Sequence, residues 1–413
     1  MIKVGSDFSG VGAFEQSLIR LGIEHETVFS CDMDKYARQT YTLNFGEPKY
    51  YPENVYDRAI PSESLGIYMS SPPCQAFSLA GKRQGEADKR GILFYNTHEF
   101  IAKNKPRYFI IENVKGLLSD DSGRTFQRWL DMLGGKSING KSIMFAHDES
   151  VPYHIHYQVL NAKHYGVPQN RERVFIVGIR DDADNNFRFP ARVPLVKRLR
   201  DVLESEVDEK YFLSERLIDF FKTNTNTNKE KGNGFAFKPK SEIDTANAIT
   251  TKSGSRIDDN YIAIPANTKQ GYEIATSEDS INFSVPNSKT RRGGVGKGVA
   301  QTLDTACNQG VLEGAIIHNI HGGFGEDAPR VFHNYSPAIR TAAGGGHIPS
   351  TMQNSRIRRL TPTECLKLMS FNDDFIERTI SSGLISDTQL YRQAGNSIVV
   401  DVLAGIIKNL KLQ

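Results

Sequence analysis

A cysteine and a glutamate of this sequence stand where a nucleophile and a proton-carrying group could act together. The run Ser71-Pro72-Pro73-Cys74-Gln75-Ala76-Phe77-Ser78 follows an apolar stretch expected to be a strand, and its two prolines fix the direction of the Cys74 thiol. Glu112-Asn113-Val114 closes the next apolar strand. A thiolate is a nucleophile, and a carboxylate at a neighbouring strand end would reach the same crevice. The alternative for Glu112 is a helix N-terminal carboxylate, whereas a merely buried cysteine needs no Pro-Pro-Cys-Gln loop.

Two further runs have residue types suited to ligands. Phe8-Ser9-Gly10-Val11-Gly12 follows the first strand, and its glycines would let the backbone approach a ligand at a helix N-terminus. A plain tight turn is the alternative, and the full G-x-G-x-x-G pattern is not present. In Gln169-Asn170-Arg171-Glu172-Arg173, the two arginines would share one face of a strand, where they could hold carboxylates or phosphates. A solvated strand edge is the alternative there.

The elements that must position these residues alternate along the first 180 residues. The apolar runs predict strands at Ile2–Val4, Glu26–Ser30, Leu65–Met69, Tyr108–Ile111, Tyr153–Leu160 and Val174–Ile179. Helical spacing predicts helices from Phe14 to Leu21 and over Lys35–Leu43, Leu93–Lys103 and Thr125–Leu133. This alternation predicts a doubly wound α/β sheet, in which ligands bind at the carboxyl ends of the strands.

The rest of the chain predicts an inserted module and a return to the first domain. Residues 185–355 are rich in Gly, Thr, Asn and Ser and favour short strands and irregular structure, with a polar mobile loop at 222–234. Thr361-Pro362-Thr363-Glu364 is a capping box that opens a helix, and Asn396-Ser397 is expected to start a final one. We therefore expect a catalytic domain over 1–184, the module over 185–355 and a C-terminal return over 356–413.

Composition limits the class of protein. The 413 residues carry 51 Lys+Arg and 48 Asp+Glu, a net charge of +3, with ordinary shares of hydrophobic and charged residues. Such a chain is globular, of two or three domains or one elaborated domain, and is not basic throughout. It shows no apolar run long enough to cross a bilayer and no signal-like N-terminus. The four cysteines match no zinc or disulfide spacing, which favours a reducing, cytoplasmic setting without a metal.

Taken in order, the motifs of this chain resemble those of the DNA (cytosine-5)-methyltransferase family. They are Phe8-x-Gly10-x-Gly12, Pro73-Cys74-Gln75, Arg90-Gly91-x-Leu93-Phe94, Glu112-Asn113-Val114, Gln169-x-Arg171-x-Arg173, Arg359-Leu360-Thr361-Pro362-x-Glu364-Cys365 and Gln393-Ala394-Gly395-Asn396-Ser397. The resemblance covers residues 1–180 and 356–413. It implies a Rossmann-like methyltransferase sheet, and it matches the module only by position, where this family carries its target recognition domain.

The resemblance also implies a mechanism. Cys74 would attack C6 of a cytosine flipped out of the duplex, so that C5 can accept a methyl group. Glu112 would hydrogen-bond N3 and the exocyclic amine, which requires a protonated carboxyl group with a raised pKa. Arg171 and Arg173 would position O2 of the base and the catalytic carboxylate.

The methyl donor implied by the resemblance is S-adenosyl-L-methionine. The implied cofactor residues are Phe8, Ser9, Gly10, Gly12, Asp32, Met33, Asn54, Val55, Pro72, Leu93, Asn396, Ser397 and Val399. Phe8 would lie against the adenine and Asp32 would accept from the ribose hydroxyls. The chain departs from the family pattern in three places: Ser6 replaces the usual acid before Phe8, Asp32 replaces a glutamate, and Asn54 replaces an acid.

Double-stranded DNA is the expected partner. Arg291, Arg292 and Lys297 form a basic, glycine-flanked run of the module suited to entering a groove, with Gln75 and Ser78 as contacts near Cys74. We expect a monomer on DNA in the cytoplasm of a bacterial or phage-infected cell, with any cognate restriction endonuclease acting separately. The alternatives are a tRNA cytosine methyltransferase on the same fold, a catalytically inactive DNA-binding regulator and, more distantly, a nicotinamide oxidoreductase.

Overall fold

The structure is a computed structural model that describes residues 1–73, 93–212, 215–231, 240, 244–249 and 358–412, and short strands between 261 and 332. Cys74, Gln75, Ser78, Arg291, Arg292 and Lys297 lie outside the described residues. The chain divides into two compact units. The first contains Met1–Val202, Thr245–Ser253 and Thr361–Gln413, and the second contains Leu203–Asp244 and Gly254–Leu360. Residues 185–202 and 245–253, which we expected in the module, thus belong to the first unit.

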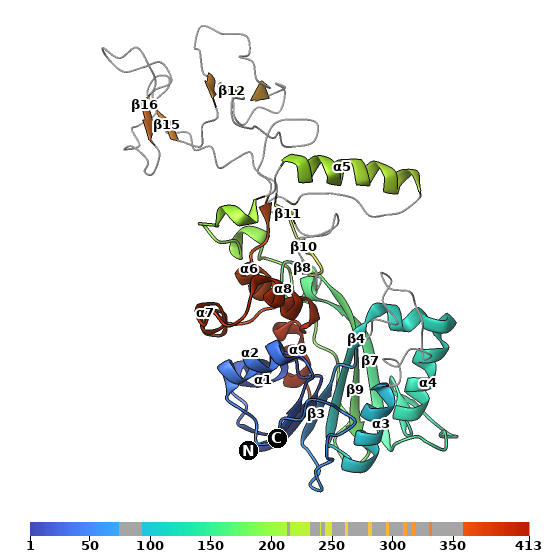
Figure 1. Ribbon diagram of the computed structural model, residues 1–413. Helices are drawn as coiled ribbons and strands as arrows, with labels where there is room; N and C mark the ends of the chain where they lie inside the picture. The colour runs from blue at the N-terminus through green and yellow to red at the C-terminus, as the bar shows by residue number, and fades with distance from the viewer. Residues whose placement is uncertain are drawn as a thin grey trace. The chain divides into compact units, whose positions relative to one another are not determined.

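The first unit is built on a mixed sheet of eight strands in the order β2-β1-β3-β4-β9-β7-β5-β6 (Figure 1). The strands are β1 (Ile2–Asp7), β2 (His25–Cys31), β3 (Ile67–Ser70), β4 (Tyr108–Val114), β5 (Ser137–Ile138), β6 (Lys141–Ser142), β7 (Tyr153–Asn161) and β9 (Glu172–Arg180). Strands β1 to β4 are mutually parallel, whereas β9 runs antiparallel to both β4 and β7. The predicted α/β sheet is therefore confirmed, and β5 and β6 are additions that the sequence did not reveal.

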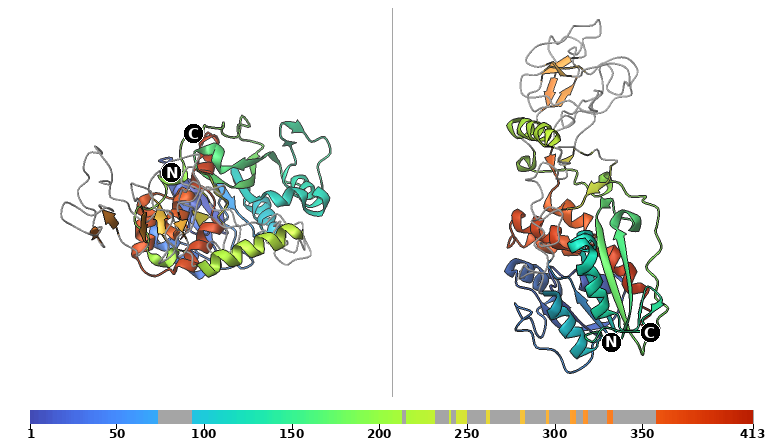
Figure 2. Two further views of the ribbon diagram at one scale, coloured as in Figure 1. Left: turned by 90° about the horizontal axis from the view of Figure 1, so that it is seen from above. Right: turned by 90° about the vertical axis from the view of Figure 1, so that its right-hand side faces the viewer.

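Helices cover both faces of this sheet, as expected for a doubly wound fold. The helices α1 (Ala13–Arg20), α2 (Lys35–Phe45) and α9 (Val400–Lys408) lie on one face, and α3 (Leu93–Asn104) and α4 (Arg124–Leu133) lie on the other (Figure 1). Both chain ends lie together at the amino end of β1, and thus away from the edge where the parallel strands end (Figure 2).

The face of the sheet that α3 and α4 cover contains a buried stack of two aromatic rings. Phe126, Trp129, Leu130 and Leu133 recur at helical spacing on α4 and are buried in one cluster with α3 and the sheet. The rings of Phe94 and Trp129 stack with centroids 3.9 Å apart and planes 9° apart. This stack packs α3 against α4 within the buried cluster.

The C-terminal segment returns to the first unit, as predicted. It contains α6 (Pro362–Leu368), α7 (Asp373–Ser381), α8 (Asp387–Asn396) and α9. The Thr361–Glu364 capping box is present, and α9 packs beside α1, where Ser17 Oγ donates to the carbonyl oxygen of Val400 at 3.3 Å. The predicted start of the last helix at Asn396 is wrong. Asn396 ends α8, and because Ser397 and Val399 have extended backbone angles, the last helix begins only at Val400.

Short elements complete the first unit. 3-10 segments cover Ala162–Tyr165 and Leu199–Asp201, and Lys115–Gly123 contains 3-10 turns interrupted by a kink at Asp120, Asp121 and Ser122. Outside the large sheet, β8 (Gln169–Asn170) pairs in parallel with β10 (Ala246–Asn247), which is the segment that returns from the insertion. The chain that leads out of the second unit is thus joined to the motif that contains Arg171.

In the second unit, the predicted loop at 222–234 is wrong over residues 222–230. Helix α5 (Glu215–Glu230) continues through this polar run, since Thr225 Oγ1 and Thr227 Oγ1 donate to the carbonyl oxygens four residues before them, at 2.8 and 3.2 Å. The other elements are a 3-10 turn (Glu209–Tyr211) and the strands β11 (Tyr261–Ile262), β12 (Ser280–Asn282), β13 (Val295–Gly296), β14 (Gln309–Val311), β15 (Ile316–His318), β16 (Arg330–Phe332) and β17 (Arg358–Arg359). They form small antiparallel sheets.

Candidate active site

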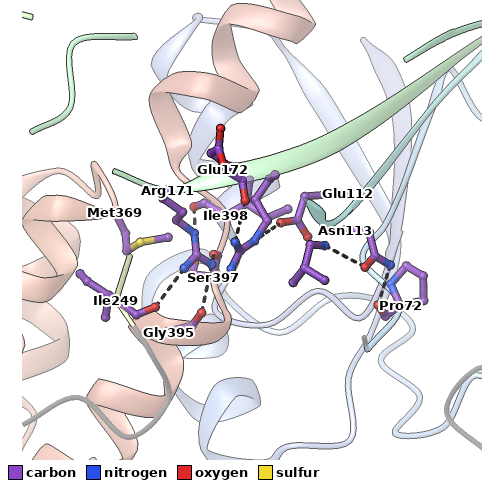
Figure 3. Close-up of polar contacts among 12 residues, drawn as sticks. Pro72, Glu112, Asn113, Arg171, Glu172, Ile249, Met369, Gly395, Ser397 and Ile398 are labelled. Carbon is purple, nitrogen blue, oxygen red and sulfur yellow. Dashed lines mark hydrogen bonds and ion pairs between the residues drawn. The ribbon is translucent and has the colours of Figure 1, made fainter. Parts of the chain in front are cut away.

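The carboxyl ends of β3 and β4 bring Pro72 and Glu112 to the same edge of the sheet. Ser70, the last residue of β3, pairs with Ile111, which directly precedes Glu112. Asn113 Nδ2 donates to the carbonyl oxygen of Pro72 at 3.4 Å, so the two strand ends are tied together (Figure 3). Pro72, two residues before Cys74 in the sequence, therefore lies at the strand end next to that of Glu112, and Cys74 itself is outside the described residues.

Glu112 is held by Arg173 from the adjacent strand. In the β4–β9 ladder Val114 lies opposite Arg173, so Glu112 and Arg173 are diagonal neighbours on one face of the sheet. Arg173 Nε lies 3.0 Å from Glu112 Oε1, and Glu112 is only 7% exposed. Burial raises the pKa of Glu112, and the nearby Arg173 and Arg171 charges reduce that rise without cancelling it. The carboxyl group is thus oriented by Arg173 and its pKa is raised by burial, and its role as a proton donor stays a prediction.

Arg171 has a different environment from Arg173. It is 3% exposed, and its two terminal nitrogens donate to main-chain carbonyl oxygens (Figure 3). Nη1 donates to Ile249 at 3.0 Å, and Nη2 donates to Gly395 at 3.0 Å and to Ser397 at 2.7 Å. These bonds join three segments that are far apart in the chain. Sequence reasoning assigned Arg171 to the substrate and could not foresee these partners, because they come from distant loops.

Gln169 is a site residue to which sequence reasoning gave no role of its own. Its Nε2 donates to the carbonyl oxygen of Leu368 at 2.7 Å, and its Oε1 accepts from the N–H of Ile249 at 3.1 Å. Gln169 and Arg171 therefore hold both main-chain polar groups of Ile249. The only signal in the sequence was their spacing of two, which puts them on the same face of an extended chain.

A second group of predicted residues meets where β1 and β2 end. Phe8, Gly10 and Gly12 all have left-handed backbone angles, with φ of 57°, 56° and 88°. The N–H of Gly10 donates to Asp32 Oδ2 at 2.8 Å, and the N–H of Asp34 donates to Asp32 Oδ1 at 2.8 Å. Burial raises the pKa of Asp32. The loop is thus fastened to the acid that the resemblance assigns to a ribose.

This edge of the sheet fits a nucleoside-bearing cofactor. A Cβ atom built on Gly10 would meet no described atom within 4 Å, so the loop faces open space there. A Cβ atom on Gly12 would instead lie 2.2 Å from the ring of Phe45. An acid beside an open, glycine-containing turn at the carboxyl end of β1 supplies the acceptor that ribose hydroxyls need. The residues present therefore suit S-adenosyl-L-methionine.

Asp7 does not replace the acid that the first motif lacks at Ser6. It is buried on the other face of the sheet, where Arg58 Nε lies 2.8 Å from Oδ1 and the Tyr68 hydroxyl donates to Oδ2 at 2.6 Å. Arg58 closes the segment of Asn54 and Val55, so the pair ties that segment to the end of β1.

The remaining predicted cofactor residues differ in exposure. Phe8 and Leu93 are partly buried against the α3–α4 core, and Pro72, Val55, Ser397 and Val399 are buried. Asn54 and Asn396 are exposed, and Met33 is 83% exposed. Ser9 is half-buried in the loop itself. The C-terminal segment approaches the Glu112–Arg173 pair through the bonds of Arg171 and through Ile398 and Val399, which line a small pocket together with Arg173.

Within the described parts of the chain, no group of three or more His, Cys, Asp or Glu side chains is arranged to hold a metal ion. None of the described helices is both long and apolar enough to span a membrane.

Comparisons with known proteins match nearly the whole chain to one family. A family model described as C-5 cytosine-specific DNA methylase matches residues 2–412. The orphan methyltransferase M.SPRI of Bacillus phage SPR is 31% identical, with 99% of this chain and 97% of that protein covered. The type II methyltransferase M.NlaX of Neisseria lactamica is 34% identical, covering 100% of this chain and 96% of that protein. In fold, the chain is similar to the Entamoeba histolytica methyltransferase EhMeth, with a TM-score of 0.61, 16% identity, and 99% and 98% of the two chains covered.

Proposed function

Because this chain belongs to the C-5 cytosine-specific DNA methylases and is an S-adenosyl-L-methionine-dependent DNA (cytosine-5)-methyltransferase, we propose that Cys74, Glu112 and Arg173 are the residues that carry out the transfer. The observation that carries this proposal is the buried Glu112–Arg173 pair at the strand end beside Pro72. It gives the Cys74 loop an oriented, proton-holding carboxyl group as its neighbour.

The chemistry follows from the properties of cytosine. The Cys74 thiolate adds to C6, which removes the aromaticity of the ring and leaves an enamine whose C5 is nucleophilic. The cofactor supplies the electrophilic methyl group that C5 takes. Glu112, whose pKa burial raises, would donate a proton to N3 and so neutralise the charge that develops on the ring. Loss of the C5 hydrogen then releases Cys74 and leaves 5-methylcytosine.

We assign Arg171 to positioning rather than to contact with the base. Its donated bonds to Ile249, Gly395 and Ser397 support this role, since they occupy both terminal nitrogens. In this role Arg171 connects two distant segments to the start of β9, where Arg173 lies. One segment contains Ile249, and the other contains Gly395 and Ser397. Arg171 Nε is buried and has no hydrogen-bond partner among the described residues, and we assign the orientation of Glu112 and the base to Arg173, which pairs with Glu112 directly.

Cofactor binding is proposed for the loop and the strand ends around it. Asp32 would accept from the ribose hydroxyls, Phe8 would lie against the adenine, and Gly10 would leave room for the ligand backbone. The other positions expected to contribute are Ser9, Gly12, Met33, Asn54, Val55, Pro72, Leu93, Asn396, Ser397 and Val399.

Sequence recognition is proposed for the inserted module, expected over 185–355. Short antiparallel strands in the second unit support a loop-rich binding module. Arg291, Arg292 and Lys297 would contact the duplex there, with Gln75 and Ser78 acting beside the flipped cytosine. The protein would work as a monomer in the cytoplasm of a bacterial or phage-infected cell, and any cognate endonuclease would act separately.

A duplex with 5-fluorocytosine at the target position tests the catalytic assignment. Fluorine at C5 cannot leave as the hydrogen does, so the Cys74–C6 bond should persist after methyl transfer and survive denaturing electrophoresis. Cys74→Ser should form no adduct, because a hydroxyl is far less ionised than a thiol near neutral pH. Cys365→Ser, a change at a buried cysteine of α6, is the matched control and should keep the adduct. Peptide mapping of the adduct to another cysteine would contradict the assignment.

A further inference from the structure

A buried carboxylate beside the cofactor loop plays no part in the mechanism above. Glu15, in the first turn of α1, is 2% exposed. Its Oε1 lies 3.4 Å from the hydroxyl oxygens of Ser6 and Ser30, which is at the limit of hydrogen bonding. Its Oε2 is buried and has no hydrogen-bond partner among the described residues. A buried carboxylate oxygen left in that state is costly, so a partner is expected.

Two hydroxyl groups in the same region are also buried without a hydrogen-bond partner among the described residues. Ser9 Oγ and the Tyr51 hydroxyl are buried beside one another, and the described residues offer neither of them a further partner. The Tyr41 ring, 5.2 Å from that of Tyr51, closes the group on the side of α2, and the Tyr41 hydroxyl accepts from Ser30. The Tyr41 hydroxyl also interacts with Glu15, and the Glu15 charge acts on Tyr51, so the unpartnered atoms Glu15 Oε2, Ser9 Oγ and Tyr51 Oη belong to one buried region at the base of the Phe8–Gly12 loop.

A second buried glutamate, at the same position of another helix, has a hydrogen-bond donor for its carboxylate. The lack of a partner for Glu15 Oε2 is therefore not explained by its helix position alone. Glu364 is also the third residue of its helix and is fully buried, but its carboxylate accepts from the N–H of Thr361 at 2.8 Å. In α1 the equivalent N–H, that of Gly12, already donates to the carbonyl oxygen of Ser9 at 3.1 Å. Glu15 therefore cannot close a capping box and keeps its carboxylate for another donor.

The missing donor should be a cation. Two acceptor-capable hydroxyls around a carboxylate suit an ammonium group, which has three donors. Among the described residues, no lysine or arginine forms an ion pair with Glu15. The loop that contains Ser9 is the one to which we assign the cofactor, and the amino-acid end of that cofactor carries an α-ammonium group.

We propose that Glu15 binds the α-ammonium group of S-adenosyl-L-methionine through Oε2, and that the hydroxyls of Ser9 and Tyr51 complete this subsite. The inference rests on the proposed placement of the cofactor on the Phe8–Gly12 loop. It adds a cofactor residue that none of the recognised motifs contains.

Binding of two ligands to the full chain tests the proposal. The ligands are S-adenosyl-L-homocysteine and its analogue with hydrogen in place of the α-amino group, and their dissociation constants are measured by calorimetry. The wild-type protein should prefer the amine by about 10- to 100-fold, the usual range for a hydrogen bond to a charged group. Glu15→Gln should lose most of that preference while binding the deaminated analogue as the wild type does. Tyr51→Phe should lose a smaller part of it.

Glu364→Gln is the matched control, a buried helix-start glutamate whose substitution should leave the preference intact. Two results would overturn the inference: an equal loss of both ligands in Glu15→Gln, which would indicate a purely structural role, or a wild-type protein that does not distinguish them. A wild-type protein that binds neither ligand would instead refute the placement of the cofactor on this loop. Far-UV circular dichroism on each variant establishes that it is folded.

Discussion

Arg173 Nε and Glu112 Oε1 lie 3.0 Å apart on neighbouring antiparallel strands, and both side chains are largely buried. The ion pair alone would hold the pKa of Glu112 down. Desolvation outweighs it, and the pKa is raised. Arg173 thus fixes the orientation of the Glu112 carboxyl group, while burial shifts that group toward its protonated form. The proposed donation to N3 of a cytosine uses both properties.

Arg173→Lys should lower kcat by about 10- to 100-fold, because a lysine has no planar fork to fix the carboxyl group and small misplacements are expensive in catalysis. The measurement is single-turnover methyl transfer to duplex DNA. Glu172→Gln is the control: its exposed side chain pairs with Lys115 at 2.9 Å, outside the Glu112 group, and should change the rate less than two-fold. Equal effects of the two changes would contradict the orienting role.

The pH dependence of kcat/KM should have a descending limb that belongs to Glu112. Since its pKa is raised, the protonated, competent form is fully populated below that pKa and is lost as pH rises through it. The Cys74 thiolate contributes the ascending limb, so the profile should be bell-shaped. Weakening the orienting ion pair with Arg173→Lys should shift the descending limb upward. A rate that still rises at the alkaline end would refute a protonated Glu112.

Arg171→Met should destabilise the first unit by about 3 kcal/mol or more, because three buried carbonyl oxygens lose their donor. Trp129 is the single tryptophan of the chain and is buried in this unit, so its fluorescence during urea unfolding reports this unit alone. Arg392→Met, at a half-exposed side chain with one ion pair of 3.5 Å, should change stability by less than about 0.5 kcal/mol. A stable Arg171→Met protein with lost activity would favour a substrate contact instead.

Gly10→Ala and Gly12→Ala should separate cofactor binding from folding. Both have positive φ, which costs an alanine about 1–2 kcal/mol, but only Gly12 faces a clash, with the ring of Phe45. Gly12→Ala should therefore lose clearly more stability in the Trp129 unfolding assay. Gly10→Ala should fold, yet bind S-adenosyl-L-homocysteine more weakly, because its methyl group occupies the open side of the loop. Unchanged binding by Gly10→Ala would remove that position from the cofactor site.

Arg291→Ala or Arg292→Ala should weaken binding to the target duplex by about 1–3 kcal/mol if the side chain reads a base, and affinity should fall with salt. Titrations at two salt concentrations, against target and scrambled duplexes, distinguish the roles. A base contact lowers only the preference for the target, whereas a phosphate contact lowers both affinities and the salt dependence. Unchanged binding in both variants would place this run outside the interface.

Local patterns were sufficient for much of the fold and the site. Apolar runs and helical spacing located β1, β2, β3, β4, β7 and β9, because a strand or an amphipathic helix is defined by the periodicity of its own residues. The capping box at Thr361 was found for the same reason, since all its bonds lie within four residues. The neighbouring strand ends of Pro72 and Glu112 followed from the rule for parallel sheets.

Two predictions made from local composition were wrong because a neighbouring helix determined the conformation. The run after Phe221 has the composition of a loop, but it continues a helix already begun, and its threonines bond back to that helix. Asn396-Ser397 has the composition of a helix start, but it follows α8 directly and serves as the end of that helix. In both cases the neighbouring segment decided the conformation of residues whose own preferences were weak.

What the sequence by itself determined was therefore the family, its chemistry and the strand ends that carry it, because motifs and periodicity are properties of short stretches of chain. Only the tertiary structure decided which buried polar groups meet. The carbonyl oxygens of Ile249, Gly395 and Ser397 converge on Arg171, and Glu15 comes to lie beside Ser6 and Ser30. The topology of the sheet brings such groups together, and once water is excluded each of them needs a hydrogen-bond partner. For Arg171 two of these partners, Gly395 and Ser397, are 224 and 226 residues away in the chain.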